Sequence, residues 1–330
     1  MAFFELEDWE IDYIRKGLKG HELKFYRDML TTDNVGYVRS CEIISVFVYS
    51  EINKKVLDRL ERLRLVTTRS TGFDHIDIDA CKKKNIAVCN VPFYGENTVA
   101  EHTFALILAL SRKIPQSYDR TIKGDFSIDG LRGFDLKGRT LGVIGTGHIG
   151  MHVIRIAKGF EMNVLAYDVK ENKKMAQRLG FRYAPLDYLM KNSDIVSIHV
   201  PLNKNTYHII NKKNIKKIKK GAVIINTARG GVIETDALVR AIYQGHLGGA
   251  GLDVLEEEDL IKEEVQLLSK KFLKRKLEIS LKNRILLKLD NVIITPHNAF
   301  NSREALHRIL DTTLENIKEF IKNKPINRVS

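Results

Sequence analysis

The stretch Leu141-Gly-Val-Ile-Gly-Thr-Gly-His-Ile-Gly150 decides the fold of this chain. Its apolar start predicts a buried strand, and the glycines that follow lead directly into a helical pattern over 151–159. A second apolar run, 163–167, ends at Asp168, which lies 18 residues beyond the last glycine. Strand, glycine-rich turn, helix, strand and acidic residue in this order predict a Rossmann-type dinucleotide-binding unit.

Each part of this motif has a physical reason. Gly145 permits the tight turn, Gly147 lets the backbone approach a pyrophosphate, and Gly150 allows close helix packing. The helix N-terminus adds N–H groups and partial positive charge, so we expect His148 and Ile149 to contact the cofactor as well. The alternative is a glycine-rich turn that binds no dinucleotide. The complete set of strand, loop, helix and acid argues against this alternative.

The acidic residue indicates which dinucleotide is bound. Asp168 can accept hydrogen bonds from both ribose hydroxyls, and its carboxylate would repel a 2′-phosphate. The sequence therefore predicts NAD rather than NADP as the cofactor. Lys170 is a nearby cation that weakens this inference slightly.

Length and composition point to a two-domain globular protein of the cytoplasm. The chain has 330 residues, of which 44% are apolar and 29% charged. No apolar run approaches the roughly 20 residues of a membrane helix. The N-terminal residues lack the pattern of a signal peptide, and the 3 cysteines form no C-x-x-C pair. We therefore expect free thiols that serve as packing residues in a reducing compartment.

The net charge of +13 raises the question of a nucleic-acid partner. The lysines are spread along the chain, and the densest run, 211–220, keeps Ile215 and Ile218 as an amphipathic helix would. Because no recognised nucleic-acid motif accompanies the charge, we interpret it as a solvated surface and do not expect nucleic acid as a partner.

The pattern along the chain is an alternation of strands and helices, which is typical of parallel sheets. The first series ends at an apolar helix over 97–112, expected to be buried and capped by Asn97 or Thr98. A polar stretch, 116–137, separates it from a second series that runs from 140 to about 295. A final helix over 302–322 ends the chain.

Three strand ends in the second series carry polar residues suited to chemistry. Arg229 follows the strand 222–225 and could hold a carboxylate with two hydrogen bonds. Asp253 lies at the end of the strand 249–254, and the acids at 256–258 follow it. His297 follows the strand 292–295, and of the 10 histidines it is the best general acid–base candidate.

Each of these residues also has an ordinary structural interpretation. Arg229 could be a surface arginine, the acidic run a solvated turn and His297 a satisfied structural histidine. Together, at successive strand ends after a cofactor loop, they form the cation, acid and imidazole set that reduction of a ketone by hydride requires. Spacing alone does not choose among Glu256, Glu257 and Glu258.

The chain resembles the D-isomer-specific 2-hydroxyacid dehydrogenases over nearly its whole length. The resemblance rests on Gly-Thr-Gly-His-Ile-Gly at 145–150, Asn-Thr-Ala-Arg-Gly at 226–230, Leu-Asp-Val-Leu-Glu-Glu-Glu at 252–258 and Thr-Pro-His at 295–297. Two further segments, 69–77 and 90–102, match the family's substrate side.

The resemblance implies a role for each candidate residue. Arg229 would bind the 2-oxo acid, His297 would donate the proton, and Glu258 would be the acid paired with it and favour the imidazolium. Asp253 would contact the nicotinamide carboxamide, while the backbone N–H groups of Thr71 and Gly72 would hold the substrate carboxylate. Further cofactor contacts are expected from Val200, Pro201, Thr227 and Ala228.

The resemblance also narrows the branch and the architecture. Tyr49 and Tyr94 match pocket tyrosines of the D-lactate dehydrogenase branch, which implies reduction of pyruvate or a related 2-oxo acid with NADH. The alternatives are a hydroxypyruvate or glyoxylate reductase, a 3-phosphoglycerate dehydrogenase and, in another class, a non-catalytic NAD-sensing regulator. The segment between Glu258 and His297 is longer and more basic than in most relatives, and its role stays open.

The expected fold is α/β, with two Rossmann- or flavodoxin-like domains whose parallel sheets are flanked by helices. We expect residues 1–97 and 298–330 to form the catalytic, substrate-binding domain and residues 98–297 the NAD-binding domain, with the active site in the interdomain cleft. The resemblance further implies a homodimer, with the helix over 97–112 as the candidate dimer element, and no metal.

Overall fold

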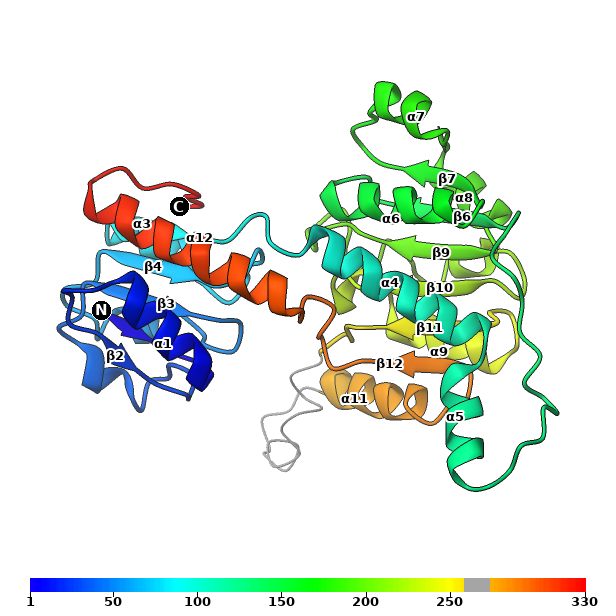
Figure 1. Ribbon diagram of the computed structural model, residues 1–330, viewed down its shortest axis with the longest axis horizontal. Coiled ribbons are helices and arrows are strands. Elements are labelled where there is room, and N and C mark those ends of the chain that lie inside the picture. The colour runs from blue at the N-terminus through cyan, green and yellow to red at the C-terminus, as the bar shows by residue number, and fades with distance from the viewer. Residues whose placement is uncertain (258–273) are drawn as a thin grey trace. The chain divides into compact units, whose positions relative to one another are not determined.

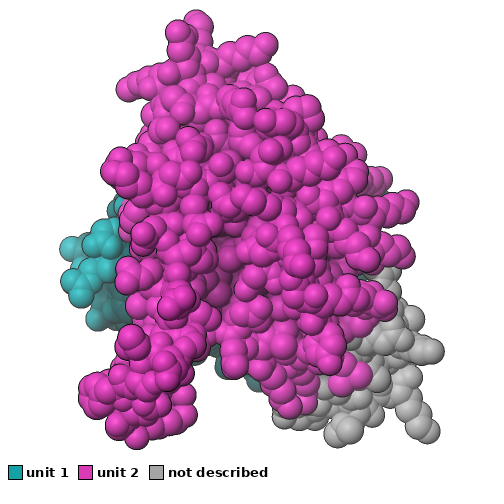
Figure 2. All heavy atoms as spheres, turned by 90° about the vertical axis from the view of Figure 1, so that its right-hand side faces the viewer, with its two compact units in different colours: residues 1–94, 301–330 teal, residues 95–300 magenta. Residues whose placement is uncertain are grey.

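The computed structural model describes the backbone of residues 1–257 and 274–330 and the side chains of residues 1–257 and 279–330. Two compact units make up this part of the chain, coloured separately in Figure 2. Unit 1 comprises Met1–Tyr94 and Asn301–Ser330, and unit 2 comprises Gly95–Phe300. Both boundaries differ by three residues from the predicted ones. Helix α4 starts at Glu96, and backbone hydrogen bonds from Asn298 and Ala299 to Asp253 keep the segment before Asn301 in unit 2.

Unit 1 is a five-stranded parallel sheet in the order β2-β1-β3-β4-β5, which is the flavodoxin-like order. Its strands are β1 (Ala2–Phe3), β2 (Lys24–Phe25), β3 (Ile43–Val46), β4 (Leu65–Thr68) and β5 (Ala87–Cys89). Its helices are α1 (Asp8–Gly17), the 3-10 helix η1 (Val35–Val38), α2 (Lys54–Leu57), α3 (Ile78–Lys83) and α12 (Arg303–Ile321).

Both faces of the unit 1 sheet are covered, which explains its continuous apolar strands. Alternate strand residues join two different cores: Ile44 and Val66 pack with Leu57 of α2. Ile43 and Leu65 pack on the other face with residues of α1 and α12. Helix α12, drawn in red-orange in Figure 1, therefore brings the end of the chain back to the first sheet.

Unit 2 is a seven-stranded parallel sheet in the order β12-β11-β10-β9-β6-β7-β8. Read from β8, this is the Rossmann order with one added edge strand. Its strands are β6 (Thr140–Ile144), β7 (Asn163–Tyr167), β8 (Arg182–Tyr183), β9 (Ile195–Ile198), β10 (Val223–Asn226), β11 (Gly249–Leu252) and β12 (Val292–Ile294). Its helices are α4 (Glu96–Ser111), α5 (Ile114–Ile122), α6 (His148–Gly159), α7 (Lys173–Leu179), α8 (Leu186–Asn192), η2 (Ile215–Lys217), η3 (Gly230–Val232), α9 (Thr235–Tyr243) and α11 (Lys274–Leu286). The predicted fold class of two parallel α/β domains is confirmed.

Helix α4 packs against α6 and against strands β10 and β11 (Figure 1). Phe104, Leu106 and Ile107 are buried there, so the expected burial of this helix is confirmed. The predicted cap is wrong, because Gly95 is the N-cap and no side chain caps the helix. Asn97 lies inside the first turn and donates a hydrogen bond to Glu101 instead.

The polar stretch 116–137, for which neither helix nor strand was predicted, contains most of α5, a helix with Pro115 in its first turn. The helix predicted for the lysine run 211–220 is wrong. This run forms only η2, because Asn211 and Asn214 form side-chain-to-backbone turns that compete with a longer helix. Ile215 and Ile218 are buried as expected, at 3% and 1% exposure.

The cysteines behave as packing residues. Cys41, Cys81 and Cys89 are free thiols and all three are buried. Burial raises the pKa of Cys81 and of Cys89 to about 11. Among the described residues, no helix is both long and apolar enough to span a membrane, and no group of three or more acidic, histidine or cysteine side chains could hold a metal ion.

Candidate active site and cofactor loop

The predicted site residues of unit 2 lie at one edge of its sheet, because they follow the carboxyl ends of neighbouring parallel strands. Ligands of open α/β sheets bind at this edge. The glycine loop follows β6, Asp168 follows β7, Val200 and Pro201 follow β9, residues 227–229 follow β10, Asp253 follows β11, and His297 follows β12.

The loop after β6 has the geometry that a pyrophosphate requires. Gly145 has a φ of +96°, and a Cβ atom there would lie 2.4 Å from the carbonyl oxygen of His199. A Cβ atom on Gly150 would lie 2.0 Å from the carbonyl oxygen of Gly145. Gly147, the N-cap of α6, has no atom within 4 Å of such a position. The loop is therefore packed tightly against the sheet and open at the helix N-terminus, which fits a dinucleotide.

Asp168 is fixed at the end of β7 by three donors. Its Oδ2 atom accepts hydrogen bonds from the N–H of Thr146 at 2.6 Å and from the Thr146 hydroxyl at 3.0 Å. Its Oδ1 atom accepts from the N–H of Lys170 at 2.9 Å. The carboxylate is thus tied to the glycine loop through Oδ2, and its Oδ1 atom keeps a lone-pair direction for a further donor.

The first helical residue after the glycine loop makes an additional contact. The Nδ1 atom of His148 lies 3.2 Å from a carboxylate oxygen of Glu96, the first residue of α4. The His148 side chain is 69% exposed. This pair links the start of α6 to the start of α4 beside the predicted cofactor loop.

The loop after β10 is held from two sides. The amide of Asn226 donates to the carbonyl oxygen of Arg229 at 2.9 Å, and its oxygen accepts from the N–H of Ala228 at 3.1 Å. The hydroxyl of Thr227 lies 3.0 Å from that of Thr103 on α4. The guanidinium of the half-buried Arg229 donates to the carbonyl oxygen of Ala228 at 2.7 Å. These contacts fix the backbone that carries the predicted substrate-binding cation.

Asp253 organises the segment that carries His297. Its side chain is 1% exposed, and its two oxygens accept hydrogen bonds from the Thr295 hydroxyl, from the N–H of Asn298 at 3.0 Å and from the N–H of Ala299 at 2.8 Å. His297 lies between these anchors with a φ of +54°. A positive φ is strained for a residue other than glycine, so the surrounding hydrogen bonds must hold it.

The acidic run after β11 divides into different roles. Glu256 is 7% exposed, and its Oε1 atom accepts a hydrogen bond from Nε2 of His208 at 2.9 Å. Its Oε2 atom accepts from the hydroxyl of Thr235 at 2.8 Å. Glu257 is exposed, and Glu258 lies outside the described residues. The pairing of Glu258 with His297 therefore stays a prediction.

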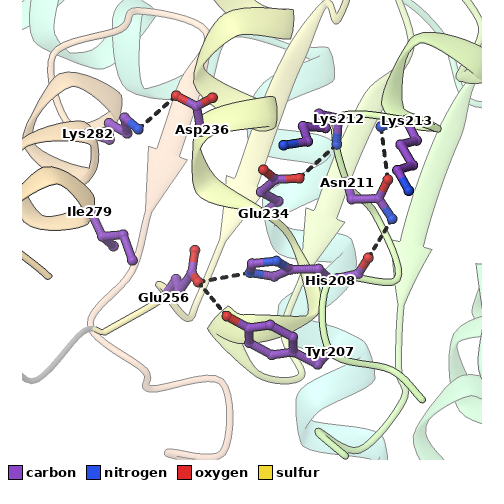
Figure 3. Close-up of a pocket in the computed structure, with 10 residues that line it drawn as sticks. All are labelled: Tyr207, His208, Asn211, Lys212, Lys213, Glu234, Asp236, Glu256, Ile279 and Lys282. Carbon is purple, nitrogen blue, oxygen red and sulfur yellow. Dashed lines mark hydrogen bonds and ion pairs between the residues drawn. The ribbon is translucent and has the colours of Figure 1, made fainter. Parts of the chain in front are cut away.

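A cavity of about 620 Å³ lies beside Glu256 (Figure 3). In the close-up, Glu256 points toward the stacked rings of Tyr207 and His208, and Lys282 points toward Asp236. Apart from Glu256, none of the candidate catalytic or cofactor-binding residues lines this cavity. Glu256 therefore has a structural role, in which its side chain joins the segment 207–208 to the start of α9.

Unit 1 carries the predicted substrate-side residues after three neighbouring strands. Tyr49 follows β3, Thr71 and Gly72 follow β4, and Tyr94 follows β5. The hydroxyl of Thr71 donates to the carbonyl oxygen of Val91 at 2.8 Å, and the carbonyl oxygen of Gly72 accepts from Ser70 at 2.6 Å. Neither backbone N–H of Thr71 or Gly72 donates to a residue in the described part of the chain.

The two tyrosines predicted for the substrate pocket are both held through their backbones. The N–H of Tyr49 donates to Glu5 at 2.7 Å, and the side chain of Tyr49 is 48% exposed. The carbonyl oxygen of Tyr94 accepts from the guanidinium of Arg308 at 2.6 Å. The expected location of the active site in the interdomain cleft stays a prediction.

Sequence reasoning assigned no role to several residues that shape the site. Thr146 lies inside the glycine motif and binds Asp168, while Thr295 lies inside the Thr-Pro-His motif and binds Asp253. His102 is a histidine in the middle of an apolar helix, and its ring lies 3.0 Å from Thr295. The sequence did offer a signal for each of them, namely a polar residue inside a motif or inside an apolar run. It could not show their hydrogen-bond partners, because those partners are distant in the sequence.

Known proteins similar to this chain agree with the geometry. Residues 104–299 match the family model "D-isomer specific 2-hydroxyacid dehydrogenase, NAD binding domain". A 2-hydroxyacid dehydrogenase homolog of Haemophilus influenzae is 37% identical over 332 residues, which cover 98% of this chain and 97% of that protein. The D-lactate dehydrogenase of Escherichia coli is 34% identical over 332 residues, with 98% and 97% coverage.

A solved structure is also similar over almost its full length. The crystal structure of D-lactate dehydrogenase from Aquifex aeolicus, complexed with NAD and lactic acid, has a TM-score of 0.87 and 41% sequence identity. The similarity covers 98% of this chain and 96% of that one. The predicted family, its lactate dehydrogenase-like branch and the NAD cofactor are confirmed. The chain therefore belongs to the D-isomer-specific 2-hydroxyacid dehydrogenases, which are NAD-dependent oxidoreductases acting on 2-hydroxy acids.

Proposed function

We propose that this enzyme is a D-lactate dehydrogenase that reduces pyruvate, or a closely related 2-oxo acid, to the D-2-hydroxy acid with NADH. The observation that carries the proposal is the arrangement after β10, β11 and β12, where Arg229, Asp253 and His297 follow three neighbouring strands. A 2-oxo acid needs a cation for its carboxylate or carbonyl oxygen and a proton donor for the alkoxide that forms.

The substrate carboxylate has two kinds of donor in this proposal. Arg229 supplies a guanidinium, which can donate hydrogen bonds to the planar carboxylate and to the keto oxygen of a 2-oxo acid. Thr71 and Gly72 supply backbone N–H groups that bind no other residue in the described part of the chain. Thr71 is exposed and Gly72 is partly exposed, so both N–H groups are accessible to a substrate carboxylate, which supports their assignment.

His297 is the proton donor of the proposed reaction. In the reducing direction its imidazolium gives a proton to the substrate's carbonyl oxygen as negative charge develops there. The hydrogen bonds from Asn298 and Ala299 to Asp253 hold the backbone on the C-terminal side of His297, and the Thr295 hydroxyl holds the other side. The imidazole is therefore presented from a fixed backbone, which lowers the cost of orienting it.

The cofactor residues fit NAD better than NADP. When bound, NADH supplies the hydride that reaches the keto carbon. Asp168, fixed by Thr146 and Lys170, would accept the ribose hydroxyls and repel a 2′-phosphate. The open position at Gly147 and the start of α6 would hold the pyrophosphate. Val200, Pro201, Thr227 and Ala228 would contact the rest of the cofactor.

The preference for pyruvate rests on the pocket residues. Tyr49 and Tyr94 follow β3 and β5, on either side of the strand that precedes Thr71. In this proposal both tyrosine side chains line the substrate pocket, restrict it to a 2-oxo acid with a short side chain, and provide hydroxyl groups as hydrogen-bond donors. A phosphorylated substrate would need further cations, and neither tyrosine supplies one.

A panel of 2-oxo acids tests the proposal. NADH consumption is measured with pyruvate, hydroxypyruvate, glyoxylate, phenylpyruvate and 3-phosphohydroxypyruvate, and the product from pyruvate is resolved by chiral chromatography. We expect the highest kcat/KM with pyruvate and D-lactate as the product. A higher value with phenylpyruvate or hydroxypyruvate would assign a different member of the family. Tight NADH binding without turnover of any of these acids would instead favour an NAD-sensing regulator.

A further inference from the structure

His102 lies on α4 and has no part in the reaction as derived above. Its Nε2 atom lies 3.0 Å from the hydroxyl oxygen of Thr295 and 3.5 Å from Oδ1 of Asp253. The His102 side chain is 21% exposed and that of Asp253 is 1% exposed. His102 thus contacts a segment that lies far away in the sequence, since 193 positions separate it from Thr295.

The direction of these hydrogen bonds follows from the chemistry of the groups. The Thr295 hydroxyl has one proton, which it donates to Oδ1 of Asp253. An ionised carboxylate can only accept hydrogen bonds, so this donation cannot be reversed. The Thr295 oxygen must then accept from His102, and Nε2 of His102 must carry a proton. The chain of donors runs from His102 to Thr295 to Asp253.

This chain of donors ends at the backbone that carries His297. The same Asp253 carboxylate accepts the N–H groups of Asn298 and Ala299, and His297 has a φ of +54°. If the Thr295 hydroxyl rotated away, the carboxylate would lose its donor on the N-terminal side of His297. The His102 ring restricts that rotation, because its N–H requires the Thr295 oxygen as an acceptor.

We propose that His102 is a positioning residue for His297, acting through Thr295 and Asp253. It would touch neither substrate nor cofactor, and it would fix the left-handed backbone from which the imidazole is presented. Its catalytic consequence rests on the proposed function. Its effect on the segment 295–299 does not, so the two can be tested separately.

The experiment compares matched variants in the full-length enzyme. His102→Gln keeps an N–H donor near the position of Nε2, whereas His102→Leu removes it. Thr295→Ser and Thr295→Val form the equivalent pair at the next position. His21→Leu, an exposed position in unit 1, controls for the loss of a histidine. Measurements are kcat and KM with pyruvate, the Kd for NADH, and hydrogen exchange of the Asn298 and Ala299 amides.

We expect His102→Leu and Thr295→Val each to lower kcat by roughly tenfold, the effect of losing about one hydrogen bond. The NADH Kd should change by less than about twofold in both, because Asp253, the member of the network expected to contact the cofactor, stays in place with its donors from Asn298 and Ala299. The amides of Asn298 and Ala299 should exchange about tenfold faster. His102→Gln and Thr295→Ser should stay within about threefold of the unsubstituted enzyme in both readouts. The kcat of the double variant His102→Leu/Thr295→Val should be no lower than that of either single variant, because both substitutions interrupt the same chain of donors.

Several results would overturn the inference. Unchanged amide exchange in both His102→Leu and Thr295→Val would show that the network does not hold this segment. Equal losses in His102→Gln and His102→Leu would indicate a packing role for the ring. If His102→Leu does not fold, the two Thr295 variants and His102→Gln still test whether the network holds the segment 295–299. If the unsubstituted enzyme turns over no 2-oxo acid, the proposed function fails, and the exchange of the Asn298 and Ala299 amides alone tests the positioning role of His102.

Discussion

At the scale of single residues, Asp253 shows how one buried charge can order an active site. A buried carboxylate is tolerated only when its oxygens are hydrogen-bonded. Asp253 meets this condition with donors that all come from the segment 295–299. The family resemblance implied a contact between Asp253 and the nicotinamide carboxamide. That contact stays a prediction, and the structure shows a different role, in which the carboxylate fixes the backbone on both sides of His297.

Asp168 carries the prediction of coenzyme choice. Asp168→Ser removes the negative charge and the two acceptors for the ribose hydroxyls, while the short side chain keeps a hydroxyl. We expect the ratio of kcat/KM for NADH to that for NADPH to fall by about 10- to 100-fold, the value of one or two charge-assisted hydrogen bonds. Steady-state kinetics with both coenzymes measure this ratio. An unchanged ratio would show that another residue selects the coenzyme.

At the scale of elements, the sequence predicted best where a local motif determines geometry. Strand β7 was predicted with its observed bounds, because an apolar run that ends at an aspartate has a clear limit. The two-residue strands β2 and β8 were missed, since so short a segment shows no periodicity. The lysine run failed for another reason. Periodicity counts apolar positions, and it ignores the competing backbone hydrogen bonds of Asn211 and Asn214.

In the candidate site, too, local motifs allowed predictions, whereas contacts between residues distant in the sequence could not be predicted. The Thr-Pro-His and Asn-Thr-Ala-Arg-Gly motifs gave His297 and Arg229 from strand ends alone. Sequence spacing could not separate Glu256 from Glu258, because neighbouring residues of a turn have similar reach. The structure shows that the Glu256 side chain is occupied by His208 and Thr235, while Glu258 lies outside the described residues.

The glycine loop allows a prediction with an internal control. In Gly150→Ala, the new Cβ would collide with the carbonyl oxygen of Gly145, so we expect a loss of about 2 kcal/mol of stability as well as of NADH affinity. In Gly147→Ala the Cβ enters open space. The thermal midpoint should then stay unchanged while NADH affinity falls by roughly tenfold, because the methyl group would occupy the pyrophosphate approach. Thermal unfolding and NADH titration separate the two. Equal effects of both variants on stability would contradict this reading of the loop.

At the scale of the whole molecule, the fold combines two sheets whose strand orders, 2-1-3-4-5 in unit 1 and 3-2-1-4-5-6 with an added strand in unit 2, belong to doubly wound folds. The alternation of strands and helices predicted parallel sheets, but it could not predict that the last helix returns to the first domain. That placement came from the family resemblance. Physically it depends on Leu310 and Leu314 of α12, which pack with Ile14 of α1.

The stability of the molecule should depend on pH through Asp194. Burial alone would raise the pKa of this carboxyl, but hydrogen bonds from Lys219 and Thr140 and the charges of Lys219 and Arg139 hold it below its ordinary value. A lowered folded-state pKa adds stability that is present above the unfolded pKa of about 3.9 and is lost as the pH falls through the folded value.

Asp194→Asn should therefore lower the free energy of unfolding by roughly 1–2 kcal/mol near neutral pH, and by progressively less below about pH 4. Urea unfolding at several pH values measures the difference. Asp187→Asn, which removes an exposed pair with Lys217, is the control and should cost less than about 1 kcal/mol. An Asp194→Asn effect that is constant from neutral to acidic pH would contradict the assignment.

The predicted homodimer can be tested on unit 2. Helix α4, the expected dimer element, already uses Phe104, Leu106 and Ile107 in its own core. Helix α5 has no buried residue, and Ile114, Tyr118 and Ile122 form a stripe on it that is 55%, 68% and 62% exposed. We propose that a second copy of the chain covers this stripe.

Tyr118→Glu should shift the sedimentation equilibrium toward the monomer by at least about tenfold, because a carboxylate would be buried in the interface. Tyr243→Glu alters another exposed tyrosine, at the end of α9, and should leave the equilibrium unchanged. A dimer that tolerates Tyr118→Glu would place the interface elsewhere.

The central claim, that this chain reduces a 2-oxo acid with His297 as its proton donor, is tested most directly by one comparison. The rate of NADH consumption with pyruvate is measured for the unsubstituted enzyme and for His297→Ala, together with the Kd for NADH. We predict a fall in kcat of about 10²- to 10⁴-fold, the contribution of a positioned general acid, with nearly unchanged NADH binding. Retained turnover in His297→Ala would contradict the account.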